Sequence, residues 1–265
     1  MGAVAVRIAG HQPDYLPYGG FFARMLMVDA FVLVDHVQFE KKSFQSRNRV
    51  AGGGPPILLS VPVRTSGRLN QSIADVRVAD PEGRWRRAHW RTLAQSYRRT
   101  PGFARHGPFF EDLYGRPWHR LLDLNLAIIE YLCRCFGITT PRHRSSGLRL
   151  AARRTGLLVQ MCKAFQADEY VSGPGGLAYV VDDELAAAGV RSTFARYRQV
   201  SYSRAPNPYV AGLSAVDLLF HADSRAGQIL RASVAGPPVP RPSRSVMAGQ
   251  PPPPLEEKWI VQPGR

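Results

Sequence analysis

The sequence predicts an α/β fold, in which a mainly parallel sheet is flanked by helices, with a helical middle section at about 84–136 and a disordered C-terminal tail. Short apolar runs typical of buried strands alternate with segments of helical spacing. A strand, a loop, a helix and a second strand follow one another within the first ~35 residues, as in a βαβ unit. Proline is dense from Gly236 onward, which predicts an extended tail outside the fold.

The first forty residues carry the clearest pattern. Ala5–Ala9 is a short apolar strand, Gly10–Gly20 is a loop rich in Gly, Pro and aromatic residues, and Phe21–Val28 has helical spacing. Phe31–Val34 is a second buried strand, so the two strands should be parallel and joined by a right-handed crossover. The expected sheet is therefore Rossmann-like.

The remaining elements follow from the same patterns. Further strands are expected at 57–63 (an edge, because of Pro62), 73–78, 170–172 and 190–194. Helices are expected at 84–99, 117–136, 155–167, 177–188 and 213–221, with Thr155 and Ser214 as N-caps and Gly189 as a C-terminal cap. We expect one catalytic domain at 1–235 and a tail at 236–265. The tail should contain no strand or helix.

Composition limits the class of protein. Hydrophobic residues make up 45% and charged residues 21%, as in a globular chain, and the net charge is +15. The excess is almost all arginine and is spread along the chain without a run, which favours codon usage over a nucleic-acid or lipid partner as its cause. A positive surface still attracts phosphates, nucleotides and acidic proteins. Three cysteines without a spaced framework, and no apolar span or signal peptide, predict a cytoplasmic chain.

Two loops carry candidate site residues. His11 and Gln12 follow the first strand, where open α/β sheets bind ligands, and a histidine there can act as a general base. Asp35 follows the second strand and should emerge at the same edge, where it could orient His11. The alternative for His11 is a satisfied structural group.

The segment after Asp35 is basic. Lys41, Lys42, Arg47 and Arg49 could contact a phosphate, and Gln45 and Asn48 could orient a polar substrate. The alternative is an exposed basic loop.

The two segments together resemble the WbqC-like protein family. The resemblance rests on HQPDYLPYGGFF, DAFVLVDHVQF, the stretch SRNRV and a strand ending in VPV, with weaker matches that include 167–173 and Tyr179. Members are associated with surface-polysaccharide and secondary-metabolite biosynthesis, which implies a transferase that moves an acyl or aminoacyl group to an amine. Carried over by motif, the functional residues are His11, Gln12, Tyr15, Asp35, Gln38, Arg47 and Asn48. Two departures concern the substrate: His36 replaces a frequent acidic residue, and a late Tyr-Pro-Gln element reads Tyr202-Ser203-Arg204.

We expect a donor bound to a carrier as a thioester, with a phosphopantetheine arm or a nucleotide as the associated group. A looser likeness to nucleotidyltransferases leaves nucleotidyl transfer from a triphosphate as an alternative, although the second histidine element of those enzymes is missing. A non-catalytic, polyanion-binding scaffold is the third possibility. Nucleic acid is the less expected partner.

Weaker candidates complete the set. Cys162 could be a thiol nucleophile, although Met161 and Phe165 favour a buried helix face. The loop from Ser172 to Gly176 could hold a phosphate or form a tight turn. The basic aromatic helix at 84–99 could dock an acidic acyl carrier protein. Histidines and acids show no metal-site spacing, so no metal is expected.

Overall fold

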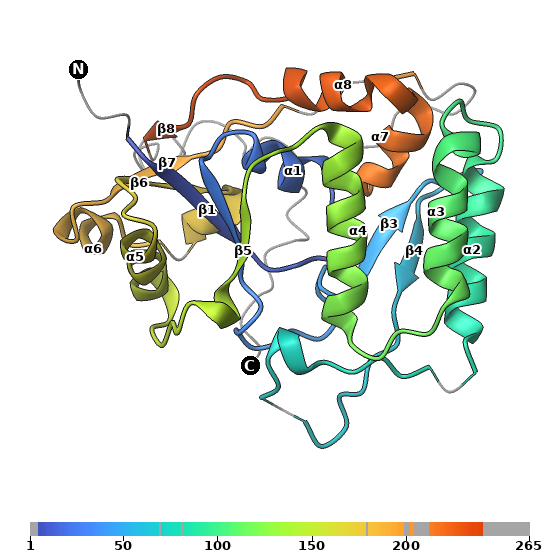
Figure 1. Cartoon of the computed structure of the whole chain (residues 1–265), viewed down its shortest axis with the longest axis horizontal. Coiled ribbons are helices and arrows are strands. Elements are labelled where there is room, and N and C mark those ends of the chain that lie inside the picture. The colour runs from blue at the N-terminus through green and yellow to red at the C-terminus, as the bar shows by residue number, and fades with distance from the viewer. Residues whose placement is uncertain are drawn as a thin grey trace.

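The main sheet has six strands in the order β5-β2-β1-β6-β7-β8 (Figure 1). This computed structural model describes residues 5–68, 70–80, 82–178, 180–198, 202–203 and 212–240. The strands are β1 (Arg7–His11), β2 (Ala30–Leu33), β5 (Arg142–Arg144), β6 (Glu169–Ser172), β7 (Arg191–Phe194) and β8 (Val239–Pro240). All neighbours are parallel except β8, which is antiparallel to β7. The predicted mainly parallel α/β fold is confirmed.

The helices are α1 (Gly19–Met25), α2 (Arg84–Tyr97), α3 (Phe103–Gly115), α4 (Leu121–Phe136), α5 (Arg154–Ala164), α6 (Asp182–Ala187), α7 (Ala215–Ala222) and α8 (Ala226–Ala232). Helices cover both faces of the main sheet, whereas α2 and α3 lie away from it and pack on each other and on α7 (Figure 1). Successive side chains of a strand point to opposite faces. Ile8 therefore joins a core with α5 and α6, whereas Ala9 joins a second, larger core with α1, α4 and α7.

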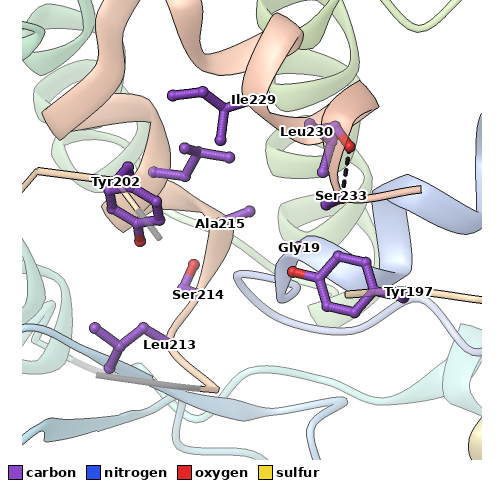
Figure 2. Close-up of a pocket in the computed structure, with 10 residues that line it drawn as sticks. Gly19, Tyr197, Tyr202, Leu213, Ser214, Ala215, Ile229, Leu230 and Ser233 are labelled. Atoms are coloured by element: carbon purple, nitrogen blue, oxygen red, sulfur yellow. Dashed lines mark hydrogen bonds between the residues drawn. The ribbon is translucent and has the colours of Figure 1, made fainter. Parts of the chain in front are cut away.

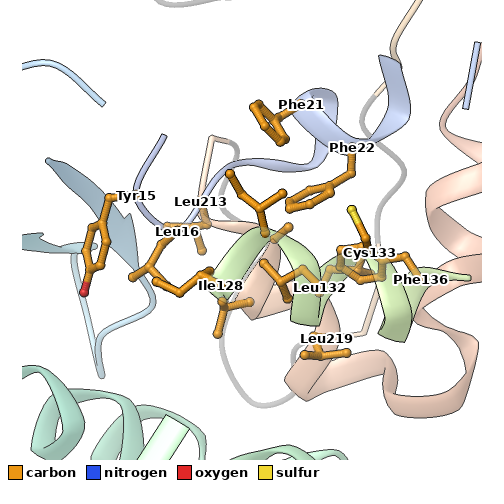
Figure 3. Close-up of a cluster of buried hydrophobic side chains, with 14 of the residues drawn as sticks. Tyr15, Leu16, Phe21, Phe22, Ile128, Leu132, Cys133, Phe136, Leu213 and Leu219 are labelled. Carbon is orange, nitrogen blue, oxygen red and sulfur yellow. The ribbon is translucent and has the colours of Figure 1, made fainter. Parts of the chain in front are cut away.

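The larger core is centred on α4. Figure 3 shows Ile128, Leu132 and Phe136 of α4 facing Phe22 of α1 and Leu219 of α7. All five are at most 1% exposed, and full burial of such a side chain contributes roughly 1.5–3 kcal/mol. This packing fixes α1, and with it the loop that precedes α1, against the rest of the molecule.

A separate two-stranded sheet lies between α4 and the pair α2 and α3 (Figure 1). It consists of β3 (Arg47–Val50) and β4 (Ile57–Ser60), paired antiparallel. The sequence predicted β4 but treated β3 as a basic loop. Its burial alternates, with Asn48 and Val50 inside, so the strand period is present although one inward residue is polar.

Several expectations need correction. Ile73–Asp75 forms a 3₁₀ turn where a strand was predicted, because Ile73 and Val76 are buried three residues apart. Thr155 is not an N-cap; its hydroxyl accepts the Val181 N–H at 3.1 Å. The predicted tail begins too early, since Val239 and Pro240 pair with β7 at the sheet edge, where proline is tolerated.

Other local signals are confirmed. The Ser214 hydroxyl accepts the Val216 N–H at 3.2 Å at the start of α7, and Gly189 takes a left-handed φ of +75° after α6. Residues 241–265 of the expected tail lie outside the described residues. Within the described ranges, no helix is long and apolar enough to cross a membrane.

Candidate functional site

The strand order reverses at the carboxyl ends of β1 and β6, and we call the region around His11, Asp14 and Arg24 at these ends the crevice. From β1 the chain moves outward to β2 and β5, then returns to β6 on the other side of β1 and continues to β7. Ligands of open α/β sheets bind where the strand order reverses in this way. His11 ends β1 and Ser172 ends β6, so both lie at this point.

Buried amides hold the loop between β1 and α1. The Asn48 amide donates to the Leu16 carbonyl at 2.7 Å, and the Asn125 amide donates to the Pro13 carbonyl at 2.8 Å. Leu16 has a φ of +46°, which a leucine adopts only when its surroundings impose it. The Gln12 side chain is fixed as well, because its carbonyl oxygen accepts from the Gln45 amide at 2.8 Å.

His11 is the titratable side chain at the end of β1. Its Nδ1 lies 2.8 Å from the Gln12 carbonyl oxygen and therefore carries the proton, which leaves a lone pair on Nε2. The ring packs edge-on against Phe21, yet 29% of the side chain remains exposed. Burial, and secondly the positive charge of Arg24, lowers the pKa of His11 to about 3. The imidazole is neutral at physiological pH and partly accessible.

Asp14 forms a pair with His11. Its Oδ2 lies 3.6 Å from His11 Nδ1, and its side chain is only 5% exposed. Burial raises the pKa of Asp14 to about 8, although Arg24 opposes this shift. At neutral pH Asp14 keeps its proton and His11 stays a neutral imidazole, so the pair has no net charge.

Arg24 supplies the positive charge of the crevice. It extends from α1 and is 7% exposed, and its Nε has no hydrogen-bond partner. Its guanidinium carbon lies 5.6 Å from the centre of the Phe31 ring, and its Nη1 lies 2.5 Å from the place where a Cβ on Gly173 would be. Arginine stays protonated, so the crevice around His11 and Asp14 has a net positive charge.

Asp35 does not hold His11, contrary to the expectation from the sequence. The two residues follow neighbouring parallel strands, but the Asp35 carboxylate turns toward β5 and accepts from Arg144 at 2.7 Å. It also accepts from Ser145 and from the backbone and hydroxyl of Ser146. Although burial alone raises the pKa of Asp35, these hydrogen bonds hold it below the usual value. Asp35 fixes the loop after β5.

Two further predicted residues are structural. Tyr15 is completely buried, with its hydroxyl bonded to His89 and Tyr114, so it does not face a ligand. Asn48 is 1% exposed and its amide is used on the loop carbonyls. Their resemblance-based assignment as substrate contacts is not supported by these positions.

The remaining candidates are scattered. Gln38 is exposed and its backbone bridges Ser72, Lys42 is exposed in a turn with a φ of +63°, and Arg47 pairs with Ser60 across β3 and β4. Cys162 is completely buried on α5, and burial raises the pKa of its thiol to about 12. A thiol nucleophile is therefore not supported at this position. Tyr179 lies outside the described residues.

A small pocket lies near the loop but outside the crevice (Figure 2). It is lined by Gly19, Tyr197 and Ser214 among others, and none of His11, Asp14 and Arg24 contributes to it. Its volume of about 20 Å³ suits one water molecule, which needs roughly 10–15 Å³. No group of three or more His, Cys, Asp or Glu side chains in the described ranges is arranged to hold a metal ion.

Comparison with known proteins shows the family of the chain. The family model described as the WbqC-like protein family matches residues 12–229. The chain belongs to the WbqC-like protein family. It is 31% identical over 229 residues, 85% of its length and 97% of the relative's, to the uncharacterized protein Rv1507c of Mycobacterium tuberculosis (strain ATCC 25618 / H37Rv). No solved structure matches.

Asp14 and Arg24 of this WbqC-like protein were not identified from the sequence. Asp14 stands inside the quoted motif, but nothing in the motif shows that it is buried beside His11. The sequence does contain a signal for Arg24. It is the single charged residue in the apolar segment Gly19–Met25, and it lies three residues after Phe21, on the buried side of the helix. A charge on a buried helix face indicates a functional or ion-paired group.

Replacing Asp35 with alanine should destabilise this WbqC-like protein by about 1–3 kcal/mol, because several hydrogen bonds to a buried acceptor are lost. Its lowered pKa makes this contribution present at neutral pH and lost as the pH falls through the folded-state pKa. Urea unfolding at pH 7 and pH 3 measures both effects. Equal stability of Asp35→Ala and wild type at pH 7 would contradict the structural role.

Replacing Asp14 with asparagine should stabilise the protein at high pH. The folded chain keeps a proton on Asp14 that the unfolded chain releases, so the contribution of Asp14 to stability decreases between about pH 4 and about pH 8, and the variant avoids this loss. The gain in melting temperature should grow across that window and then level off. Asp112→Asn, at an exposed position, is the control. A gain that is the same at pH 4 and pH 8 would contradict the raised pKa.

Proposed function

We propose that this protein is a biosynthetic transferase that moves an acyl or aminoacyl group from a carrier-bound thioester to an amine acceptor. The observation that carries the proposal is His11: an accessible, neutral imidazole with a free Nε2 at the point where the strand order reverses. A base at this position can accept a proton from an attacking amine.

The proposed reaction accounts for the acyl group and for the proton that the amine loses. The amine nitrogen attacks the thioester carbonyl, His11 Nε2 accepts the amine proton, and the C–S bond breaks. The same proton then passes to the departing thiolate, which gives an amide and a free thiol. The Gln12 carbonyl oxygen, which accepts from Nδ1 at 2.8 Å, favours the imidazolium while it exists.

The charge of the surface supports an acidic carrier protein as the source of the thioester. Along α2 and the two residues after it, five arginines are exposed: Arg84, Arg87, Arg91, Arg98 and Arg99. A positive face of this kind attracts an acidic partner and speeds the encounter.

Replacing His11 with glutamine should reduce turnover by about 10²–10⁴-fold while the chain still folds. Release of free thiol from acyl and aminoacyl thioesters of pantetheine and coenzyme A, with a panel of primary amines, measures turnover. His119→Gln, at an exposed position, is the matched control. Wild-type turnover by His11→Gln in the same assay would remove His11 from the mechanism.

Nucleotidyl transfer is a second candidate, favoured by the strand order of the sheet, which nucleotide-binding folds share. It requires a nucleoside triphosphate and Mg²⁺. Release of pyrophosphate from triphosphates, without release of thiol from thioesters, would support nucleotidyl transfer over acyl transfer.

A polyanion-binding scaffold is the third candidate. It predicts binding to polyanions that depends steeply on salt concentration and is unchanged in His11→Gln.

A further inference from the structure

A buried, positively charged side chain without a matching negative charge is the unexplained feature of the crevice. Arg24 is 7% exposed, and no ion pair within the described ranges neutralises it. A buried charge is costly unless it is paired and hydrogen-bonded. The nearby acid, Asp14, has a pKa raised to about 8 by burial and keeps its proton at neutral pH, so it leaves the charge uncompensated.

The Arg24 guanidinium ends against the backbone that follows β6. It lies so close to Gly173 that a Cβ there would be 2.5 Å from Nη1. The neighbouring Ser172 hydroxyl is buried and has no hydrogen bond, but it points to the opposite side of β6, where a Cβ on Gly176 would lie 3.0 Å from its Oγ. Arg24 is therefore the unsatisfied donor on the side of the strand ends where His11 packs against α1.

We propose that Arg24 binds a phosphate group of the ligand at the carboxyl ends of β1 and β6. The planar guanidinium can donate two parallel hydrogen bonds to phosphate oxygens. A phosphate offers three acceptor oxygens and the negative charge that the crevice lacks. The assignment rests on the proposed function only in expecting the donor of the transferred group at this place.

A bound phosphate also changes the chemistry of His11. The charge of Arg24 is one of the two causes that lower the pKa of His11. A phosphate on Arg24 offsets this charge and raises the basicity of the imidazole toward the range in which a general base works. The ligand thereby contributes to activating the base that acts on it.

Isothermal titration calorimetry of the full chain with four compounds identifies the source of the phosphate. Coenzyme A carries the phosphates of a pantetheine donor, pantetheine lacks them, ATP with Mg²⁺ represents a nucleotide, and inorganic phosphate tests the group alone. Binding of coenzyme A but not pantetheine supports the phosphate of a pantetheine donor, and binding of ATP alone supports a nucleotide. If none of the phosphate compounds binds at millimolar concentration, the proposal is wrong.

Two pairs of variants test the residues with the tightest phosphate compound. Arg24→Met removes the charge and keeps the length, and it should weaken binding by about 10–100-fold, as loss of a charge-assisted hydrogen bond does. Arg225→Met, at an exposed position, changes the net charge equally and should bind as wild type. Equal binding by both variants would show that phosphate is attracted by the general surface charge.

Gly173→Ala decides the question if Arg24→Met does not fold. The added Cβ meets only the end of the Arg24 side chain, so the fold can adjust while the guanidinium is displaced and the charge is kept. Binding should weaken by about tenfold or more, whereas Gly115→Ala, which meets nothing within 4 Å, should bind as wild type. Wild-type affinity of Gly173→Ala would overturn the site. These measurements need no turnover, so failure of the transferase assay leaves them valid.

Discussion

The structure depends on burying both faces of the strand that opens the main sheet. Ile8 points into the core under α5 and α6, and Ala9 points into the core around α4. Because β1 is central, with β2 on one side and β6 on the other, its carboxyl end is the place where the strand order reverses. The same constraint that stabilises the sheet therefore positions His11 beside the end of β6.

Rigidity of the loop after β1 comes from distant polar residues. Asn48 on β3 and Asn125 on α4 bind the carbonyls of Leu16 and Pro13. Buried backbone groups in a loop must find such partners. The small sheet and the helical middle section thus support the candidate site, which explains why a polar residue occupies an inward position of β3.

Local patterns were enough to predict β1, β2, β4, β6 and β7 and the helices α1, α2, α4, α5, α6 and α7, and to single out His11 as a candidate. They failed where the partner is distant in sequence or the element is polar. Asp35 binds Arg144, which is 109 residues away. The strand β5 is an exposed, charged edge strand, so its sequence contains no apolar run that would predict it. Tyr15 looked like a ligand contact because the motif places it in the loop, but its partners His89 and Tyr114 belong to α2 and α3.

The chemistry of the crevice follows from how three charges are balanced. Burial opposes ionisation of both His11 and Asp14, so the pair has no net charge, whereas arginine cannot release its proton. Folding the chain without ligand therefore leaves one positive charge in a poorly hydrated place, at a cost in stability. An anionic ligand removes that cost when it binds. The free energy that is released in this way adds to the affinity of the protein for the ligand. The buried arginine thus favours a charged ligand over a neutral one and ties the basicity of the histidine to the presence of that ligand.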